Sequence, residues 1–223
     1  MFVFLDIGFT LLGGPAQGPA ARLMAQFDLP SVVKPGLNHL LFATPLSAPE
    51  ELAQYLERTY GLPVGKTQGF IIDLWQKQVA EAFPLPGAKT LLTRLQSAKI
   101  PFAFITNIWA PFLDGFKHHF SLDWDRHPIF ASFQLGCLKP DPEIFHIALR
   151  HTACDPRQAI MIGDTYETDI APALALGMKT IWVLSRPDKE RCDLAAVLNQ
   201  SKPAPHHTVA DVLPFDIDRL KNL

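Results

Sequence analysis

The fold is decided by one stretch of the chain, Ala159-Ile-Met-Ile-Gly-Asp-Thr-Tyr-Glu-Thr-Asp-Ile-Ala-Pro-Ala-Leu-Ala-Leu-Gly-Met-Lys-Thr-Ile181. An apolar strand leads into Gly163-Asp164, and a second acid, Asp169, opens a helix a few residues later. Open α/β folds bind ligands at the carboxyl edge of the sheet, where this arrangement places carboxylates. The first strand, Phe2-Val-Phe-Leu-Asp6, also ends in an aspartate. Acids from separate strand ends, with no basic residue beside either, favour a divalent cation with oxygen ligands.

The composition is typical of a soluble globular protein. Of the 223 residues, 48% are apolar, and the net charge is −2. A chain of this length is long enough for one domain plus an inserted subdomain. Twenty basic against 22 acidic residues favour neither a nucleic-acid nor a membrane partner. The apolar runs are strand-sized and no signal peptide is visible, so we expect a cytoplasmic location. For the assembly we expect a monomer or a small homo-oligomer, between which the sequence does not choose. The three cysteines lack Cys-x-x-Cys spacing, which predicts reduced thiols.

Strand-like and helix-like segments alternate along most of the chain. Apolar, β-rich segments predict strands at Phe2–Leu5, Pro101–Ile105, Ile129–Phe133, Ala159–Ile162, Thr180–Leu184 and His207–Val209. Helical periodicity lies between most of them, at Ala88–Ser97, Asp141–His151 and Asp169–Leu176. Alternation of this kind predicts an α/β fold, a three-layer Rossmann-like sandwich around a parallel sheet.

The segment from residue 13 to residue 84 breaks this alternation. It shows amphipathic helical segments separated by short breaks at Leu29-Pro30 and Gly61-Leu-Pro63, and no convincing strand. We therefore predict an α/β core of residues 1–12 and 85–223 with an all-helical cap of residues 13–84. An insert directly after a strand end that carries an acid is well placed to act as a lid.

Four short motifs follow one another in the chain: Phe4-Leu-Asp6-Ile-Gly-Phe-Thr10, Phe104-Ile-Thr106-Asn107, Leu138-Lys139-Pro-Asp-Pro-Glu143 and Gly163-Asp164-Thr-Tyr-Glu-Thr-Asp169. With these motifs in this order, and a helical insert between the first two, the chain resembles the haloacid dehalogenase-like (HAD) hydrolase superfamily over its whole length. The resemblance implies a Mg²⁺-dependent phosphatase that acts on a small phosphorylated metabolite through an aspartyl-phosphate intermediate.

Chemistry alone suggests a role for two of the acids, Asp6 and Asp164. A carboxylate can attack phosphorus and form a covalent intermediate that water later cleaves, which makes Asp6 the candidate nucleophile. A Mg²⁺ ion between Asp6, Asp164 and the phosphate offsets the repulsion between these anions. The family pattern adds the backbone carbonyl of Gly8 as a third protein ligand.

The remaining candidates surround the phosphate. Thr106 offers a hydroxyl group and Asn107 an amide N–H to phosphate oxygens. Lys139 supplies a compact positive charge for the transferring group. Asp169 then orients Lys139 or a metal-bound water from behind. Thr10, four residues after the candidate nucleophile, is expected to support the site in the same indirect way.

The chain departs from the family pattern at Gly8. Phosphatases of the superfamily carry a second aspartate there, which protonates the leaving group and then activates water; this chain has Gly8 followed by Phe9. Loss of general acid–base help costs about 10²–10⁴ in rate. A phosphatase with this departure acts on good leaving groups or borrows an acid from the cap, where the candidates are Glu50, Glu51, His39 and Tyr60.

Two other interpretations stay open. Carbon–halogen cleavage needs no acid, although the dehalogenases lack the acid that Asp164 represents, and the phosphonate-cleaving branch needs a cap lysine, for which Lys34 and Lys66 are available. A protein that binds phosphate and magnesium with little or no turnover is the last alternative. The retained cluster of like charges argues against it, since a scaffold has no physical need for that cost.

Overall fold

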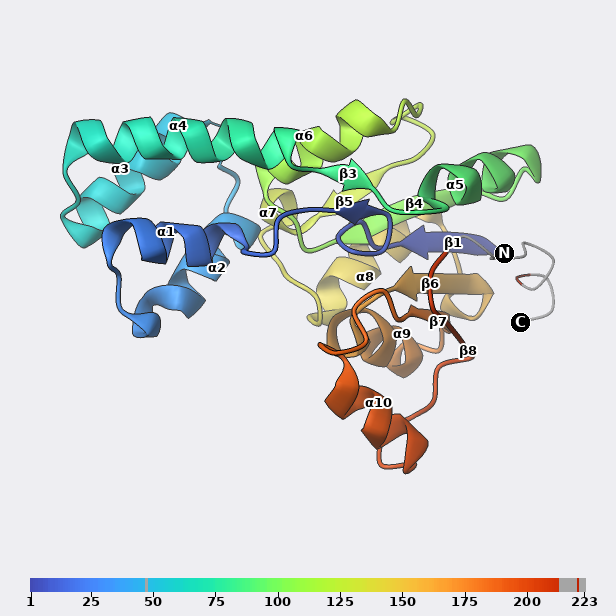
Figure 1. Cartoon of the computed structure of the whole chain (residues 1–223). Coiled ribbons are helices and arrows are strands. Elements are labelled where there is room, and N and C mark those ends of the chain that lie inside the picture. Colours follow the sequence, from blue (N-terminus) through green and yellow to red (C-terminus); the bar gives the residue numbers. More distant parts are fainter. Residues whose placement is uncertain (47, 213–219, 221–223) are drawn as a thin grey trace.

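The computed structural model describes residues 1–46, 48–212 and 220, and its central feature is a parallel β-sheet (Figure 1). Every pairing in this six-stranded sheet is parallel. Across the sheet the order is β5 (Ile129–Ala131), β4 (Phe102–Thr106), β1 (Phe2–Leu5), β6 (Ala159–Gly163), β7 (Lys179–Val183) and β8 (His207–Val209). The strand order reverses beside β1, so the carboxyl ends of β1, β4 and β6 lie next to one another.

Alternation along β1 shows how the sheet is covered. Val3 and Leu5 belong to one buried apolar cluster and Phe4 to another, because successive side chains of a strand point to opposite faces. Helices α5 (Ala88–Ser97) and α6 (Ala110–His119) contribute to the first cluster, and α8 (Pro142–Thr152) and α9 (Ala171–Ala175) to the second. The predicted three-layer α/β sandwich is confirmed.

Along the chain, a helical insert lies between β1 and the later strands of the sheet. It begins and ends at a short antiparallel ribbon of β2 (Leu12–Gly13) and β3 (Phe83–Pro84). Between them lie α1 (Pro19–Phe27), the 3₁₀ turn η1 (Ser31–Val33), α2 (Lys34–Ala43), α3 (Pro49–Tyr60) and α4 (Val64–Ala80). These helices enclose an apolar cluster of their own, and Figure 1 shows them beyond the end of the sheet where the parallel strands finish.

The remaining short elements are α7 (Ser132–Leu135), η2 (Pro156–Gln158), the π-helical turn η3 (Tyr166–Ile170) and α10 (Arg191–Leu198). The strand predicted at Ile129–Phe133 is shorter than expected, because α7 begins directly after Ala131. In the described part of the chain, no helix is long and apolar enough to cross a membrane.

Two helix boundaries test the sequence signals directly. Asp141 caps α8 as expected, since its side chain accepts a hydrogen bond from the backbone N–H of Glu143 at 2.9 Å. The prediction that Asp169 opens a helix is wrong. The turn begins at Tyr166, and the Asp169 carboxylate instead accepts a hydrogen bond from the backbone N–H of Thr165 at 3.0 Å.

Candidate active site

The site is built where three neighbouring strands end. Asp6 follows β1, Thr106 is the last residue of β4, and Asp164 follows β6. Because β1 pairs in parallel with both β4 and β6, these positions meet at one edge of the sheet. The point where the strand order reverses is where open α/β sheets bind ligands. The sheet topology thus delivers the predicted residues to one place.

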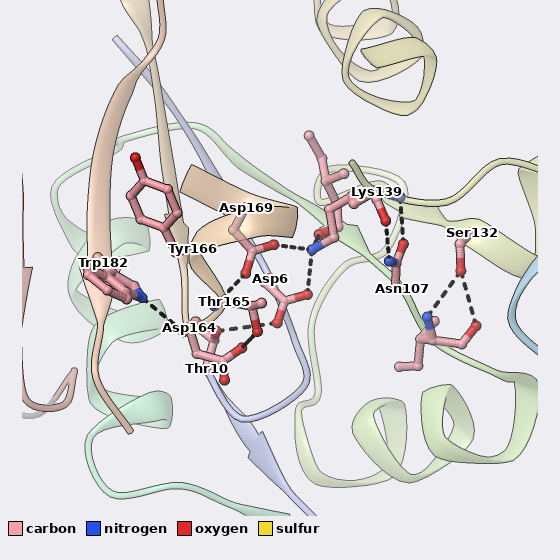
Figure 2. Close-up of polar contacts among 12 residues, drawn as sticks. Asp6, Thr10, Asn107, Ser132, Lys139, Asp164, Thr165, Tyr166, Asp169 and Trp182 are labelled. Carbon is pink, nitrogen blue, oxygen red and sulfur yellow. Dashed lines mark hydrogen bonds and ion pairs between the residues drawn. The ribbon is translucent and has the colours of Figure 1, made fainter. Parts of the chain in front are cut away.

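Lys139 is the cation at the centre of this edge, where Figure 2 shows it between Asp6 and Asp169. Its side chain is almost completely buried. Its Nζ donates to Asp6 Oδ1 at 2.8 Å, to Asp169 Oδ1 at 2.5 Å and to the carbonyl of Ile105 at 2.9 Å. An ammonium group has three donors, so all of them are used. Burial lowers the pKa of Lys139, but Asp169 and Asp6 outweigh it and raise the pKa to about 12. The side chain is therefore a fixed positive charge.

Three carboxylates approach one another at the same edge. One oxygen from each of Asp6, Asp164 and Asp169 lies within 4.8 Å of the others, and all three residues are buried. Burial, followed by the neighbouring charge of Asp6, raises the pKa of Asp164 to about 6, although Arg186 opposes the shift. An oxygen-only donor set of this charge fits a hard divalent cation such as Mg²⁺. Lys139 binds Asp6 Oδ1 and Asp169, so the groups not bound to Lys139 that could hold such an ion are Asp6 Oδ2 and Asp164.

The threonine and asparagine candidates lie around this cluster in different ways. Thr10 donates to Asp6 Oδ2 at 3.3 Å. Asn107 binds the backbone of Lys139 twice, accepting from its N–H and donating to its carbonyl, each at 2.8 Å. The Thr106 hydroxyl is buried and has no hydrogen-bond partner among the described residues. Asn107 therefore positions Lys139 with its side chain, whereas the Thr106 hydroxyl lies buried without a partner.

Arg186 is a site residue that the sequence reasoning missed. Its Nε and Nη2 donate to Asp164 Oδ2 at 2.9 and 2.5 Å, and its guanidinium lies 3.7 Å from the centre of the Phe9 ring. Phe9 is held there by Ser185, whose hydroxyl donates to the Phe9 carbonyl at 2.6 Å. A signal was present, because Arg186 follows the carboxyl end of another predicted strand, which is the criterion that identified the acids.

Asp164 and Asp169 are further positioned by the segments around them. Trp182 on β7 donates from its indole N–H to the Asp164 carbonyl at 3.0 Å. A methyl group on Gly163 would lie 2.4 Å from Cγ of Asp169, so only glycine leaves room for this carboxylate against the end of β6. The glycine of the Gly-Asp pair thus serves close packing.

A cavity of about 440 Å³ lies between this edge and the helical insert. Its wall includes Asp6, Gly8, Asn107, Lys139, Asp164 and Asp169 from the predicted site. Thr10 and Thr106 are not part of the wall. The insert contributes Asn38, Phe42 and Gln78 to the wall, Trp109 comes from the residue just before α6, and Phe112 comes from α6 itself.

The side chains considered as replacement acids do not reach this cavity. Among the described residues, the wall contains none of Glu50, Glu51, His39 and Tyr60. It contains neither of the insert lysines that phosphonate chemistry would require, since both Lys34 and Lys66 are exposed elsewhere on the insert. The ionisable side chains in the wall all come from the α/β part of the chain.

Comparison with known proteins agrees with this architecture. A family model described as HAD-hydrolase-like matches residues 136–214. The glyceraldehyde 3-phosphate phosphatase of Pyrococcus abyssi is 28% identical over 196 residues, which are 81% of this chain and 79% of that protein. The phosphoserine phosphatase of Thermus thermophilus is 32% identical over 122 residues, 48% of this chain, and the match spans 46% of its length, about half.

A solved structure gives the same result for the fold. The crystal structure of a HAD family enzyme from Bacteroides thetaiotaomicron, a magnesium complex, superimposes with a TM-score of 0.61 at 19% identity, over 80% of this chain and 90% of that one. The fold, the clustered motif residues and the sequence matches agree with one another, and together they support membership of the chain in the haloacid dehalogenase-like hydrolase superfamily.

Proposed function

We propose that the protein is a Mg²⁺-dependent phosphatase that hydrolyses the phosphate ester of a small metabolite. The observation that carries the proposal is the cluster of Asp6, Asp164 and Asp169 around the buried Lys139, open to a cavity of metabolite size. The phosphatases among the relatives support it, because the activities that their names describe are hydrolyses of phosphate esters. We propose the helical insert, residues 13–84, as the cap that closes the cavity and excludes water.

In the proposed reaction Asp6 is the nucleophile. One of its carboxylate oxygens forms a bond to phosphorus while the bond from phosphorus to the leaving oxygen breaks, which gives an aspartyl-phosphate. Water then attacks phosphorus, the bond to Asp6 breaks, and phosphate is released with Asp6 regenerated. Lys139 holds its charge beside the transferring group throughout, because Asp169 and the Ile105 carbonyl fix its ammonium.

The metal ion would be held by Asp6 Oδ2, Asp164 and the backbone carbonyl of Gly8. When bound, Mg²⁺ supplies positive charge that offsets the repulsion between the carboxylates and the phosphate. Thr106 and the main chain of Asn107 are the proposed phosphate contacts. The Thr106 hydroxyl is unpartnered, which supports that role, but it does not line the cavity and would have to become accessible to the phosphate. Thr10 supports Asp6 through its hydrogen bond.

The leaving oxygen receives no proton from the residue two positions past Asp6, because that residue is Gly8. No glutamate, histidine or tyrosine is part of the cavity wall among the described residues, so the proton comes from water or from the substrate. Phosphonate chemistry loses support because neither insert lysine lines the cavity. The cytoplasmic location and the monomeric or small oligomeric state expected from the sequence stay predictions.

The test is release of p-nitrophenol from p-nitrophenyl phosphate, measured with Mg²⁺ and with a chelator. This leaving group scarcely needs a proton, so the missing acid at Gly8 should not prevent the site from turning over this substrate. We expect Mg²⁺-dependent turnover, and we expect Asp6→Asn to lower it by at least about 10³-fold while circular dichroism stays unchanged. Asp123→Asn makes the same change at an exposed loop and should keep the wild-type rate. Turnover retained by Asp6→Asn would exclude the covalent mechanism.

A further inference from the structure

The wall of the cavity divides into a charged end and an uncharged end. Among the described residues, its charged side chains are Asp6, Lys139, Asp164, Asp169, Arg186 and Lys189, and all of them belong to the α/β part of the chain. The insert faces this edge with Asn38, Phe42 and Gln78, and the uncharged rings of Trp109 and Phe112 also line the cavity. A phosphate bound at the charged end therefore directs its leaving group toward a wall of aromatic rings and two carboxamides.

Gln78 is the unusual side chain in this wall. It lies on α4 in line with Ile71 and Leu74, on the face that packs into the apolar cluster, and only 2% of its surface is exposed. Its side-chain oxygen is buried and has no hydrogen-bond partner among the described residues. Buried polar atoms in folded proteins nearly always have a partner, so this oxygen calls for one from outside the described chain. Gln78 lines the cavity, and a turn of its carboxamide would bring this oxygen to a partner bound there.

We propose that Gln78 sets substrate specificity by hydrogen bonding to a hydroxyl group on the leaving group of the phosphate ester. The proposal rests on the phosphatase function proposed above and adds a substrate class to it: phosphate monoesters of small, uncharged, hydroxylated alcohols. A hydroxyl group both donates and accepts, so it satisfies the carboxamide in either orientation. The aromatic rings of Trp109 and Phe112 cover the carbon skeleton beside it.

The same wall disfavours leaving groups that carry a charge. An ammonium group would need a carboxylate, but those in the wall belong to the cluster around Lys139 and Arg186. A carboxylate would need a cation, and each cation of the wall already has a partner in this structure: Lys139 binds Asp6, Arg186 binds Asp164, and Lys189 binds Thr165 and Glu190. An ion placed against aromatic rings and amides loses its hydration without gaining a partner. The cavity therefore selects against amino-acid-like leaving groups such as that of phosphoserine.

The experiment compares glycerol 3-phosphate with propyl phosphate, which has the same three-carbon chain without the two free hydroxyl groups. In the wild type we expect a higher kcat/KM for glycerol 3-phosphate. In Gln78→Leu the ratio of the two kcat/KM values should fall by about tenfold or more, because the hydroxyl group meets an apolar side chain. Gln76→Leu makes the same change on the exposed face of α4 and should leave the ratio unchanged.

A variant that gains activity toward a new substrate distinguishes a change in specificity from a loss of activity caused by misfolding. Gln78→Glu places a carboxylate in the wall. The kcat/KM for phosphoethanolamine, whose leaving group carries an ammonium, should therefore rise relative to the kcat/KM for glycerol 3-phosphate. Misfolding cannot produce this reversal. The proposal is overturned if the wild type shows no preference for glycerol 3-phosphate over propyl phosphate. It is also overturned if Gln78→Leu lowers kcat/KM for both esters equally, which indicates a structural role only.

The failure of the phosphatase function would be recognised separately. If the wild type turns over none of the esters, p-nitrophenyl phosphate included, the proposed function is wrong. The ratio is then read from dissociation constants of glycerol 3-phosphate and propyl phosphate, measured by calorimetry with Mg²⁺ for the wild type, Gln78→Leu and Gln76→Leu. A wild-type preference that Gln78→Leu removes keeps Gln78 as the selecting residue. Equal constants, or a preference that Gln78→Leu retains, overturn the proposal.

Discussion

Two cations divide the three carboxylates of the site between them. Lys139 binds Asp6 and Asp169, whereas Arg186 binds Asp164. The Lys139 side chain is 2% exposed and that of Arg186 is 30% exposed, so water reaches only the second pair. Lys139 is therefore the fixed cation of the site. Arg186, which shares Asp164 with the proposed metal ion, is the cation that has to yield or rearrange when the metal binds.

Replacement of Arg186 tests this division of roles. Arg186→Met leaves Asp164 buried without a cation, so we expect the metal-free protein to lose about 1–2 kcal/mol in its free energy of unfolding. The affinity for Mg²⁺ should increase, because the competing positive charge is gone. Urea unfolding with a chelator and calorimetry with Mg²⁺ measure the two effects.

The control for Arg186 is Arg191→Met, which removes an arginine whose ion pair with Asp188 is exposed on both sides. Its effect on the free energy of unfolding should stay within about 0.5 kcal/mol. An Arg186→Met protein with unchanged affinity for Mg²⁺ would show that Arg186 and the metal do not compete for Asp164.

Gly8 makes the missing acid directly testable. A Cβ atom at this position would meet nothing within 4 Å, so the first atom of a side chain has room here. If the acid is merely absent, Gly8→Asp should raise kcat for an alkyl phosphate by about tenfold or more, since general acid–base help is worth about 10²–10⁴. p-Nitrophenyl phosphate should gain less, because its leaving group scarcely needs a proton. Gly8→Asn is the matched control, and an equal gain in that variant would exclude proton transfer as the cause.

At the scale of elements, the turn from β6 into α9 holds the second half of the site. The π-helical turn η3 carries Asp169 inward against Gly163. It is anchored from outside by Glu190, a buried residue whose carboxylate accepts a hydrogen bond from the Tyr166 N–H at 2.8 Å. The Tyr166 hydroxyl donates to the Pro203 carbonyl at 2.6 Å. The position of Asp169 therefore depends on contacts with later segments of the chain as well as on its own turn.

Gly163, the last residue of β6, packs closely against Asp169 of that turn. Gly163→Ala places a methyl group 2.4 Å from Cγ of Asp169, so Asp169 or the strand end must move. We expect a loss of about 1–3 kcal/mol in the free energy of unfolding, measured by urea titration, together with lower turnover. Gly69→Ala makes the same substitution in α4, where the added methyl group meets nothing within 4 Å. That control should gain up to about 1 kcal/mol, because alanine favours the helix. Equal effects of the two substitutions would contradict the close-packing role of Gly163.

At the scale of the whole molecule, the site joins segments that are far apart in the sequence. Asp6 and Asp164 come from adjacent strands, Lys139 from the segment between α7 and α8, and the opposite cavity wall from the insert. A cation bound between Asp6 and Asp164 exists only when β1 and β6 are paired. Metal binding is therefore coupled to folding of the entire sheet.

This coupling predicts a concentration-dependent stabilisation by Mg²⁺. At about 100 times its dissociation constant, Mg²⁺ should add about 2.7 kcal/mol to the free energy of unfolding. Asp164→Asn should lose most of this gain, whereas Asp141→Asn, which changes an exposed helix cap, should keep it. Thermal melts across a Mg²⁺ titration measure the effect. An Asp164→Asn protein that Mg²⁺ stabilises as much as the wild type would show that the ion binds elsewhere.

The sequence predicted the parts of the molecule that depend on local patterns. The strands were visible as short apolar segments, and the cap of α8 was visible in Asp141-Pro142. The prediction failed at Asp169, which lies within a π-helical turn and accepts a hydrogen bond from the Thr165 N–H. In the sequence, an acid just before a helical segment looks the same as a helix cap. The ribbon of β2 and β3 was missed since two-residue strands carry no periodicity.

What the sequence by itself determined is the meeting of Asp6, Thr106 and Asp164, because parallel strands of one sheet finish at a common edge. Only the tertiary structure decided which partners those residues have. Arg186 on Asp164 and Gln78 in the cavity wall depend on how a loop and a helical insert pack against that edge. Packing of this kind is set by the fit of many side chains from distant segments, and no local pattern of residues records it.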